Sequence, residues 1–120
     1  MASLGLDGPY ALEAATIDST VTRTSPGNYA LGYVNDKGSF IVHYVGRADK
    51  HLNARLKQWV GQKSKYKSFK AGYASSAKVA FEKECQNYHD FGGSDKLDNE
   101  YHPDRPSGTD WKCPVCRIFG

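Results

Sequence analysis

The chain has 120 residues, of which 39% are hydrophobic and 24% are charged, and its formal net charge is +3. This composition is typical of one small globular domain, and the length excludes a large core. No stretch approaches the roughly 20 consecutive apolar residues of a membrane helix, so we expect no membrane partner. The N-terminus lacks the basic start and apolar run of a signal peptide, which favours a reducing, cytoplasmic location.

The charges are unevenly distributed along the chain. The segment 55–70 contains no acidic residue, whereas acids predominate in 89–110. Basic residues interleaved with aromatic ones are typical of a surface that binds a phosphate backbone, although a solvated surface has the same composition. The sequence therefore predicts DNA as a partner, with these lysines as contacts: Lys57, Lys63, Lys65, Lys67 and Lys70.

The first half of the chain predicts a lead-in followed by a β-hairpin. Residues 1–24 are weakly patterned, and we expect them to pack on a single domain that occupies 25–120. Alternating aromatic, aliphatic and small residues predict strands over 29–34 and 39–45. The sequence Asn-Asp-Lys-Gly at 35–38 predicts the tight turn between them.

The second half predicts two helices around a third strand. Apolar residues recur at helical spacing from about 49 to 60, and a polar strand follows over 65–73. Ser75 or Ser76 can cap a second helix that runs to about Tyr88. Glu84 falls on the apolar side of that helix, where a carboxylate is costly unless it is paired or binds a cation.

Two Gly/Tyr triplets lie on the hairpin strands, namely Gly27-Asn28-Tyr29 and Tyr44-Val45-Gly46. Arg55 follows on the first helix, Glu84 lies on the second, and Asn99 comes fifteen positions later (99 − 84). This ordered set resembles the GIY-YIG nuclease family over about residues 26–100. Two positions depart from the pattern: Asn28 replaces an aliphatic residue, and Arg55 lies one position farther from Tyr44.

The resemblance implies an α+β fold with a three-stranded antiparallel sheet flanked by helices and an irregular C-terminal tail. It also implies a metal-dependent endonuclease that hydrolyses phosphodiester bonds in DNA. A chain this short has little room for a sequence-reading domain, so we expect structure-selective or weakly specific cutting, or a protein partner that supplies specificity. A non-catalytic nucleic-acid-binding module and a zinc-stabilised interaction module on the same fold are the alternatives.

The chemistry of cleavage assigns a role to each candidate residue. Glu84 can hold one Mg²⁺ or Mn²⁺ ion, with Glu82 as the rival ligand, and Arg55 can donate two hydrogen bonds to the scissile phosphate. The resemblance implies that Tyr29, with a lowered pKa, is the general base and that Tyr44 positions the water or phosphate.

Two assignments of the candidate site stay open. The resemblance implies that Asn99 orients the phosphate or a nearby side chain. Strand alternation alone allows either Tyr29 or Tyr33 to face the site.

A second set of residues predicts structural zinc. Cys85 and His89 are four residues apart on one helix face, and Cys113 and Cys116 form a Cys-x-x-Cys pair. Together they would make a Cys₃His site that clamps the tail 100–120, with His102 as a rival fourth ligand. Thiols without a metal are the alternative interpretation.

Overall fold

The computed structural model describes residues 6–62 and 65–99, which form an α+β domain built on one antiparallel sheet. Its four strands lie in the order β1-β4-β2-β3. The elements in chain order are β1 (Asp7–Ala11), α1 (Ala14–Thr20), β2 (Gly27–Val34), β3 (Phe40–Ala48), α2 (Leu52–Lys57), β4 (Ser68–Tyr73), α3 (Ala77–Asp90) and the single turn α4 (Gly93–Lys96).

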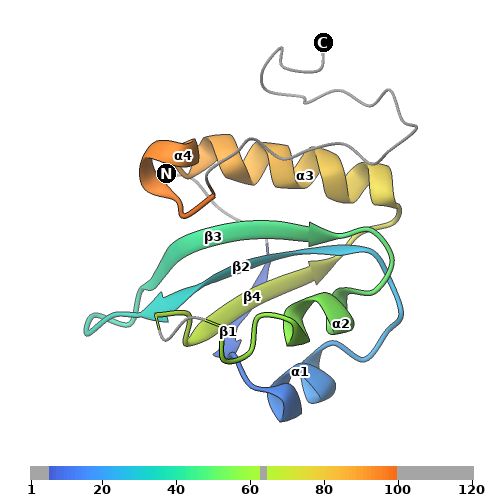
Figure 1. The fold of residues 1–120 in the computed structure, drawn as a ribbon, viewed down its shortest axis with the longest axis horizontal. Coiled ribbons are helices and arrows are strands. Elements are labelled where there is room, and N and C mark those ends of the chain that lie inside the picture. The colour runs from blue at the N-terminus through green and yellow to red at the C-terminus, as the bar shows by residue number, and fades with distance from the viewer. Residues whose placement is uncertain (1–5, 63–64, 100–120) are drawn as a thin grey trace.

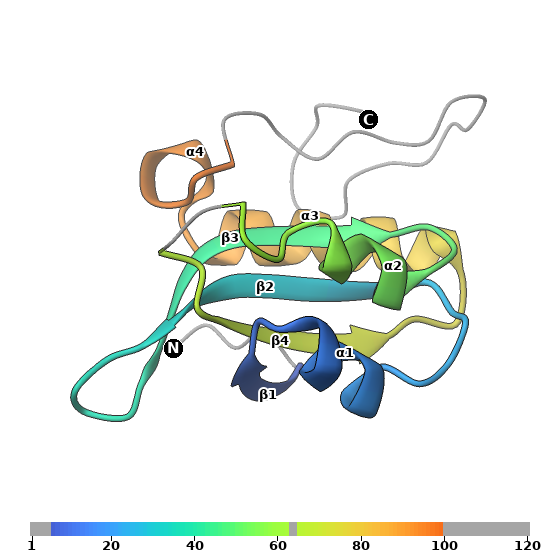
Figure 2. The same cartoon turned by 60° about the horizontal axis from the view of Figure 1, so that its bottom comes forward.

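Helices cover both faces of the sheet. Helix α3 lies along one face, which we call the α3 face, and the short helices α1 and α2 lie on the other, the α2 face (Figure 1). Turning the molecule brings α1 and α2 in front of the sheet and α3 behind it (Figure 2). Each face has its own cluster of buried residues, centred on Leu31 and Phe69 on the α2 face and on Ala30 and Val45 on the α3 face. The predicted antiparallel sheet flanked by helices is therefore confirmed.

The predicted number of strands was wrong, because the lead-in adds a fourth. Strand β1 pairs antiparallel with β4, and Leu12 and Ile17, which follow it, are buried in the core of the α2 face. No alternation of apolar and polar residues marks this strand, since Gly8 and Pro9 occupy its middle and its side chains are largely exposed.

The hairpin between β2 and β3 forms as predicted. Asn35 Oδ1 accepts hydrogen bonds from the backbone N–H groups of Lys37 and Ser39, both at 3.0 Å, and Gly38 has φ +80°. A register shift follows Leu31, whose partner is Tyr44, whereas the partner of Gly32 is Val42. The extra residue on β3, His43, is a β-bulge within the paired strands, between the triplets and the turn.

The helices differ in how well their bounds were predicted. Helix α3 begins as expected, because the Ser76 hydroxyl accepts a hydrogen bond from the N–H of Val79 at 3.2 Å. Helix α2 is shorter than predicted: it begins at Leu52, with no side-chain cap at His51, and ends at Lys57, where turns follow. Within residues 6–62 and 65–99, no helix combines the length and apolar character needed to cross a membrane.

Candidate functional site

The two tyrosines of the Gly/Tyr triplets lie side by side on the α2 face. Their rings are stacked with centroids 6.4 Å apart, and the Tyr29 hydroxyl accepts a hydrogen bond from Trp59 Nε1 at 2.9 Å. The Tyr29 ring lies directly over Gly46, where an added Cβ would come within 2.4 Å of its hydroxyl oxygen. The glycine of the second triplet is therefore required by the tyrosine of the first.

Arg55 on α2 faces both phenols. Its guanidinium is exposed and lies close enough to Tyr29 and Tyr44 to act on both electrostatically, in each case favouring the ionised phenol. Its Nη1 donates to Gln58 Oε1 at 3.3 Å. An exposed arginine beside two tyrosines can bind an anionic group that approaches from solvent.

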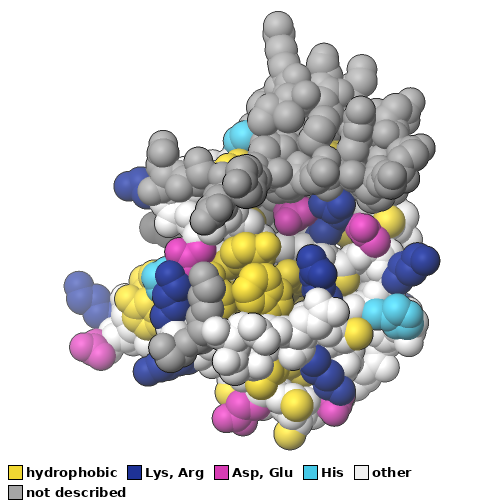
Figure 3. Space-filling model, in the orientation of Figure 1, with side chains coloured by type: hydrophobic (Ala, Val, Ile, Leu, Met, Phe, Trp, Pro, Cys, Tyr) yellow, Lys and Arg dark blue, Asp and Glu magenta, His cyan; other side chains and the backbone are white. Residues whose placement is uncertain are grey.

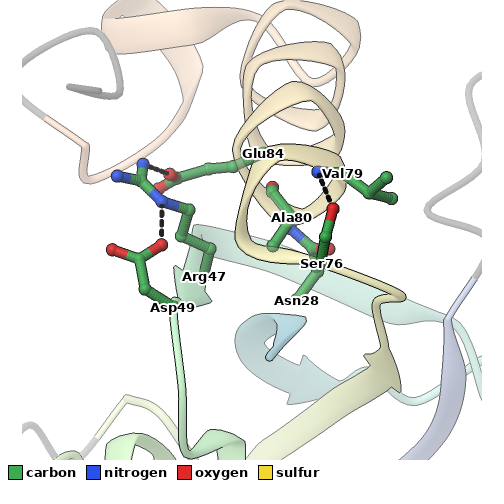
Figure 4. A network of polar contacts seen from close by, with 7 residues as sticks. All are labelled: Asn28, Arg47, Asp49, Ser76, Val79, Ala80 and Glu84. Atoms are coloured by element: carbon green, nitrogen blue, oxygen red, sulfur yellow. Dashed lines mark hydrogen bonds and ion pairs between the residues drawn. The ribbon is translucent and has the colours of Figure 1, made fainter. Parts of the chain in front are cut away.

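Glu84 approaches the same region from α3 on the opposite face, and it is paired with an arginine that was not predicted. Arg47 Nη1 donates to Glu84 Oε1 at 2.6 Å, and Arg47 Nε donates to Asp49 Oδ1 at 2.8 Å (Figure 4). The guanidinium also lies 5.1 Å above the ring of Phe81. Arg47 follows the second triplet directly, and that position beside Gly46 was the signal available in the sequence.

Burial controls the protonation of these groups. It raises the pKa of Glu84 to about 7 even though Arg47 opposes the shift. Burial, and then the charge of Glu84, raise the pKa of Tyr44. Burial raises the pKa of Tyr29 to about 12, with Tyr44 adding to the shift and Trp59 and Arg55 opposing it. Burial of the phenol therefore opposes the lowering of the Tyr29 pKa that we expect beside a bound metal ion.

Edge strand β3 lies between the residues of the two faces: the phenols and Arg55 on the α2 face, and Arg47 and Glu84 on the α3 face. Tyr44 points to the α2 face and Arg47 to the α3 face, yet Tyr44 experiences both the charge of Glu84 and that of Arg55. Tyr29, Tyr44 and Arg55 therefore lie on the α2 face, and Glu84 lies across edge strand β3 on the α3 face, close enough for its charge to act on Tyr44 and for Arg55 to act on it. On this side of the molecule hydrophobic side chains form a patch with Lys and Arg around its border (Figure 3).

Asn99, the fifth predicted residue, holds the backbone of β3. Its side-chain amide donates to the carbonyl of Val45 at 2.8 Å and accepts from the Val45 N–H at 3.1 Å. The buried amide thus replaces a neighbouring strand at the outer edge of β3, next to Tyr44. This contact is to the backbone of β3, so the two roles expected of Asn99, orienting a phosphate or a nearby side chain, stay predictions.

A row of aromatic side chains extends from the site toward the hairpin. The ring centroid of Tyr44 lies 4.7 Å from that of Trp59 and 6.4 Å from that of Tyr66. The stacked rings of Tyr33 and His43 have their centroids 5.3 Å apart. Tyr33 therefore lies with His43, away from Arg55, and Tyr29 is the tyrosine that joins the candidate site. Trp59 and Tyr66 were not predicted as part of it, although their place in the aromatic, basic segment was a signal.

The predicted DNA-binding lysines do not form one surface. Lys57 pairs with Asp18 at 2.6 Å on the α2 side. Lys65 pairs with Asp98 at 2.7 Å and Lys67 is exposed, whereas Lys70 lies 5.5 Å from the ring centroid of Phe40. Phe40 packs in the α3-face cluster, so Lys70 belongs to the opposite side of the sheet. The continuous basic stretch is therefore split between the faces, and Lys63 lies outside the described residues.

The candidate metal ligands are only partly described. Cys85 is buried on α3, and His89 lies one turn later. The other predicted zinc ligands, Cys113 and Cys116, and the rival His102 lie outside the described residues. Among 6–62 and 65–99, no three His, Cys, Asp or Glu residues are grouped to hold a metal ion. Glu84 and the rival Glu82 differ in that Glu84 alone is buried against the sheet.

Comparison of the chain with protein-family models, curated proteins and solved structures found no match.

Proposed function

We propose that the protein is a metal-dependent endonuclease of the GIY-YIG type that hydrolyses phosphodiester bonds in DNA. The observation that carries the proposal is the arrangement of four residues from four different elements on the two sides of β3: Tyr29, Tyr44 and Arg55 lie on one side and Glu84 on the other, and Arg55 and Glu84 both act electrostatically on Tyr44. An acid, a guanidinium and two phenols are the groups needed to bind a cation, hold a phosphate and direct hydrogen bonds to the reacting oxygens.

Glu84 is the residue that would hold the divalent ion. One carboxylate suits Mg²⁺, which usually keeps several waters and takes few protein ligands. Its carboxylate has a second oxygen beyond the Oε1 that bonds Arg47, and Asp49 lies on the same guanidinium. When bound, such an ion would polarise the phosphate and stabilise the leaving oxygen.

The remaining residues act on the substrate or on one another. Arg55 is exposed and would donate hydrogen bonds to the phosphate as negative charge develops there. Tyr44 is half-buried and keeps its proton at neutral pH, so it would donate a hydrogen bond to the phosphate or the attacking water. Tyr29 is buried beneath it and would hold Trp59 in place.

Cleavage assays with matched variants test the proposal. Supercoiled, branched and single-stranded DNA are incubated with the wild type, Glu84→Gln and Arg55→Ala in Mg²⁺ and in Mn²⁺. We expect metal-dependent cutting that each variant lowers by about 100-fold or more. Glu82→Gln, which changes an acid on the same helix outside the buried face, serves as the control and should cut like the wild type. Equal cutting by all proteins, or none in any metal, would overturn the proposal.

A non-catalytic nucleic-acid-binding module is the second candidate, and the Arg47–Glu84 ion pair favours it. In that function the acid is neutralised permanently by Arg47 and no cation enters. DNA binding would then weaken with rising salt but would not respond to EDTA, and no metal would support cutting.

The predicted structural zinc is a separate proposal. Cys85 and His89, one turn apart on α3, are two of its four ligands, and Cys113 and Cys116 are the others. Metal analysis of the purified protein should give one zinc per chain, and the double variant Cys113→Ser/Cys116→Ser should lose it.

A further inference from the structure

Asn28, the residue that departs from the family pattern, is tied to the helix that carries Glu84. Its side chain is 1% exposed, and its Nδ2 donates to the backbone carbonyl of Ala80 at 2.8 Å (Figure 4). A buried amide in an otherwise apolar interface is costly unless its hydrogen bonds are made. The contact is therefore a specific connection between β2 and α3.

The carbonyl that Asn28 contacts is already part of the helix ladder. In an α-helix the N–H of residue i donates to the carbonyl of residue i−4, so the Ala80 carbonyl also receives the N–H of Glu84. Asn28 thus binds the same peptide oxygen to which the backbone of Glu84 is bonded. A change at Asn28 would be transmitted to the carboxylate through one hydrogen bond of the helix.

Asn28 and Arg47 form a two-point attachment of α3 to the sheet. They are partners across the β2–β3 ladder, and they contact α3 one turn apart, at Ala80 and at Glu84. A divalent ion on the second oxygen of Glu84 would share the carboxylate with Arg47 and weaken that attachment. The Asn28 contact does not involve the carboxylate, so it keeps its full strength when the ion is bound.

We infer that Asn28 is a positioning residue that fixes the turn of α3 bearing Glu84 when the cation is bound. The inference depends on the proposed function, since it concerns the metal ligand of that site. Asn28 contacts neither the ion nor the DNA, and its effect should appear in the metal dependence and not in DNA binding.

The test compares two variants at Asn28 with a control elsewhere on α3. Asn28→Leu has nearly the same size and no donor, and Asn28→Thr has a donor that ends one bond short of the amide nitrogen. Ser76→Ala removes the cap of the same helix and leaves the attachment to β2 intact. Urea denaturation of all four proteins identifies which variants are folded, and either Asn28 variant that folds is sufficient.

Two measurements are made on each protein: direct binding of Mn²⁺ by calorimetry without DNA, and cleavage over a range of Mg²⁺ concentrations. Replacing a residue that orients a metal ligand typically costs about tenfold or more in metal affinity. We expect both Asn28 variants to need about tenfold more metal, with less than about twofold change in the DNA concentration for half-maximal rate. Ser76→Ala should match the wild type in both.

The outcomes separate the two claims. A wild type that binds metal and cuts, beside folded Asn28 variants with unchanged metal dependence, overturns the positioning role alone. An equal shift in Ser76→Ala would also overturn it, because general weakening of α3 would then explain the effect. A wild type that neither binds Mn²⁺ nor cuts overturns the proposed function itself.

Discussion

The two faces of the sheet differ in the kind of side-chain contact that they hold. The α2 face is aromatic: Tyr29, Tyr44 and Trp59 pack together, and their polar atoms are few and neutral. The α3 face carries a charged contact, the ion pair between Arg47 and Glu84, in a largely buried setting. Strand β3 therefore divides the site: one side holds the phenols and the exposed guanidinium of Arg55, and the other side holds the titrating carboxylate of Glu84.

A substitution on the α3 side of β3, which holds the Arg47–Glu84 ion pair, should destabilise the protein more than one on the α2 side. Removing one partner of a buried ion pair typically costs about 3–5 kcal/mol, because the other charge is left unpaired. We therefore expect Arg47→Met to lower the free energy of unfolding by about this amount at pH 8. Urea denaturation measures it, and the loss should shrink at pH 6, where Glu84 can take up a proton. A loss that is the same at both pH values would show that the unpaired charge is not its cause.

The titration of Glu84 gives the next largest effect. Its pKa is about 7 in the folded chain against 4.5 for the ordinary group, so the folded state holds this proton more tightly. The stabilisation is fully present below about pH 4.5 and is lost as the pH rises through 7. Between pH 4.5 and 8 the wild type should lose on the order of 3 kcal/mol relative to Glu84→Gln. Parallel curves of stability against pH for the two proteins would contradict this.

The substitution Asn99→Ala removes the two hydrogen bonds that the Asn99 amide makes to the outer edge of β3. The change leaves the buried N–H and carbonyl of Val45 without the amide that pairs both of them. We expect a loss of about 2 kcal/mol, since each unsatisfied buried group costs about 1–3 kcal/mol and water can reach an edge strand in part. Hydrogen exchange should show a faster-exchanging Val45 amide, and an unchanged exchange rate would remove the proposed role of Asn99.

Substitutions in the Tyr29–Trp59 pair on the α2 side of β3 should have the smallest effect on stability. A double-mutant cycle with Tyr29→Phe and Trp59→Phe isolates the hydrogen bond between their side chains, with an expected coupling of about 1 kcal/mol. The coupling should not depend on pH between 5 and 8, since neither side chain titrates there. A pH-dependent coupling would show that the charge of Glu84 reaches this hydrogen bond from the other side of β3.

Local signals in the sequence predicted the parts of the fold that depend on local chemistry. The Asn35–Gly38 turn and the Ser76 cap form as expected, because each is satisfied by hydrogen bonds within four residues. Strand β1 was missed because its stability comes from pairing with β4, about sixty residues away, and not from its own pattern.

The sequence predicted those residues of the site whose side-chain type by itself indicates their chemistry. The ordered tyrosines and Arg55 lie together on the α2 face, and Glu84 acts on Tyr44 from the other side of β3. The ion pair of Arg47 with Glu84 joins residues 37 positions apart, and no spacing rule connects a strand arginine to a helix acid. Likewise the raised pKa of Tyr29 follows from complete burial, which depends on how α2 and Trp59 close over it.

Strand β1 also has a consequence for handling the protein. It covers the outer side of β4, while the Asn99 amide occupies part of the outer side of β3. A chain trimmed to begin at residue 25 would keep every candidate site residue but would present β4 as an open ladder of backbone donors and acceptors. Such ladders recruit other chains, so the shortened protein should self-associate even where its chemistry is intact.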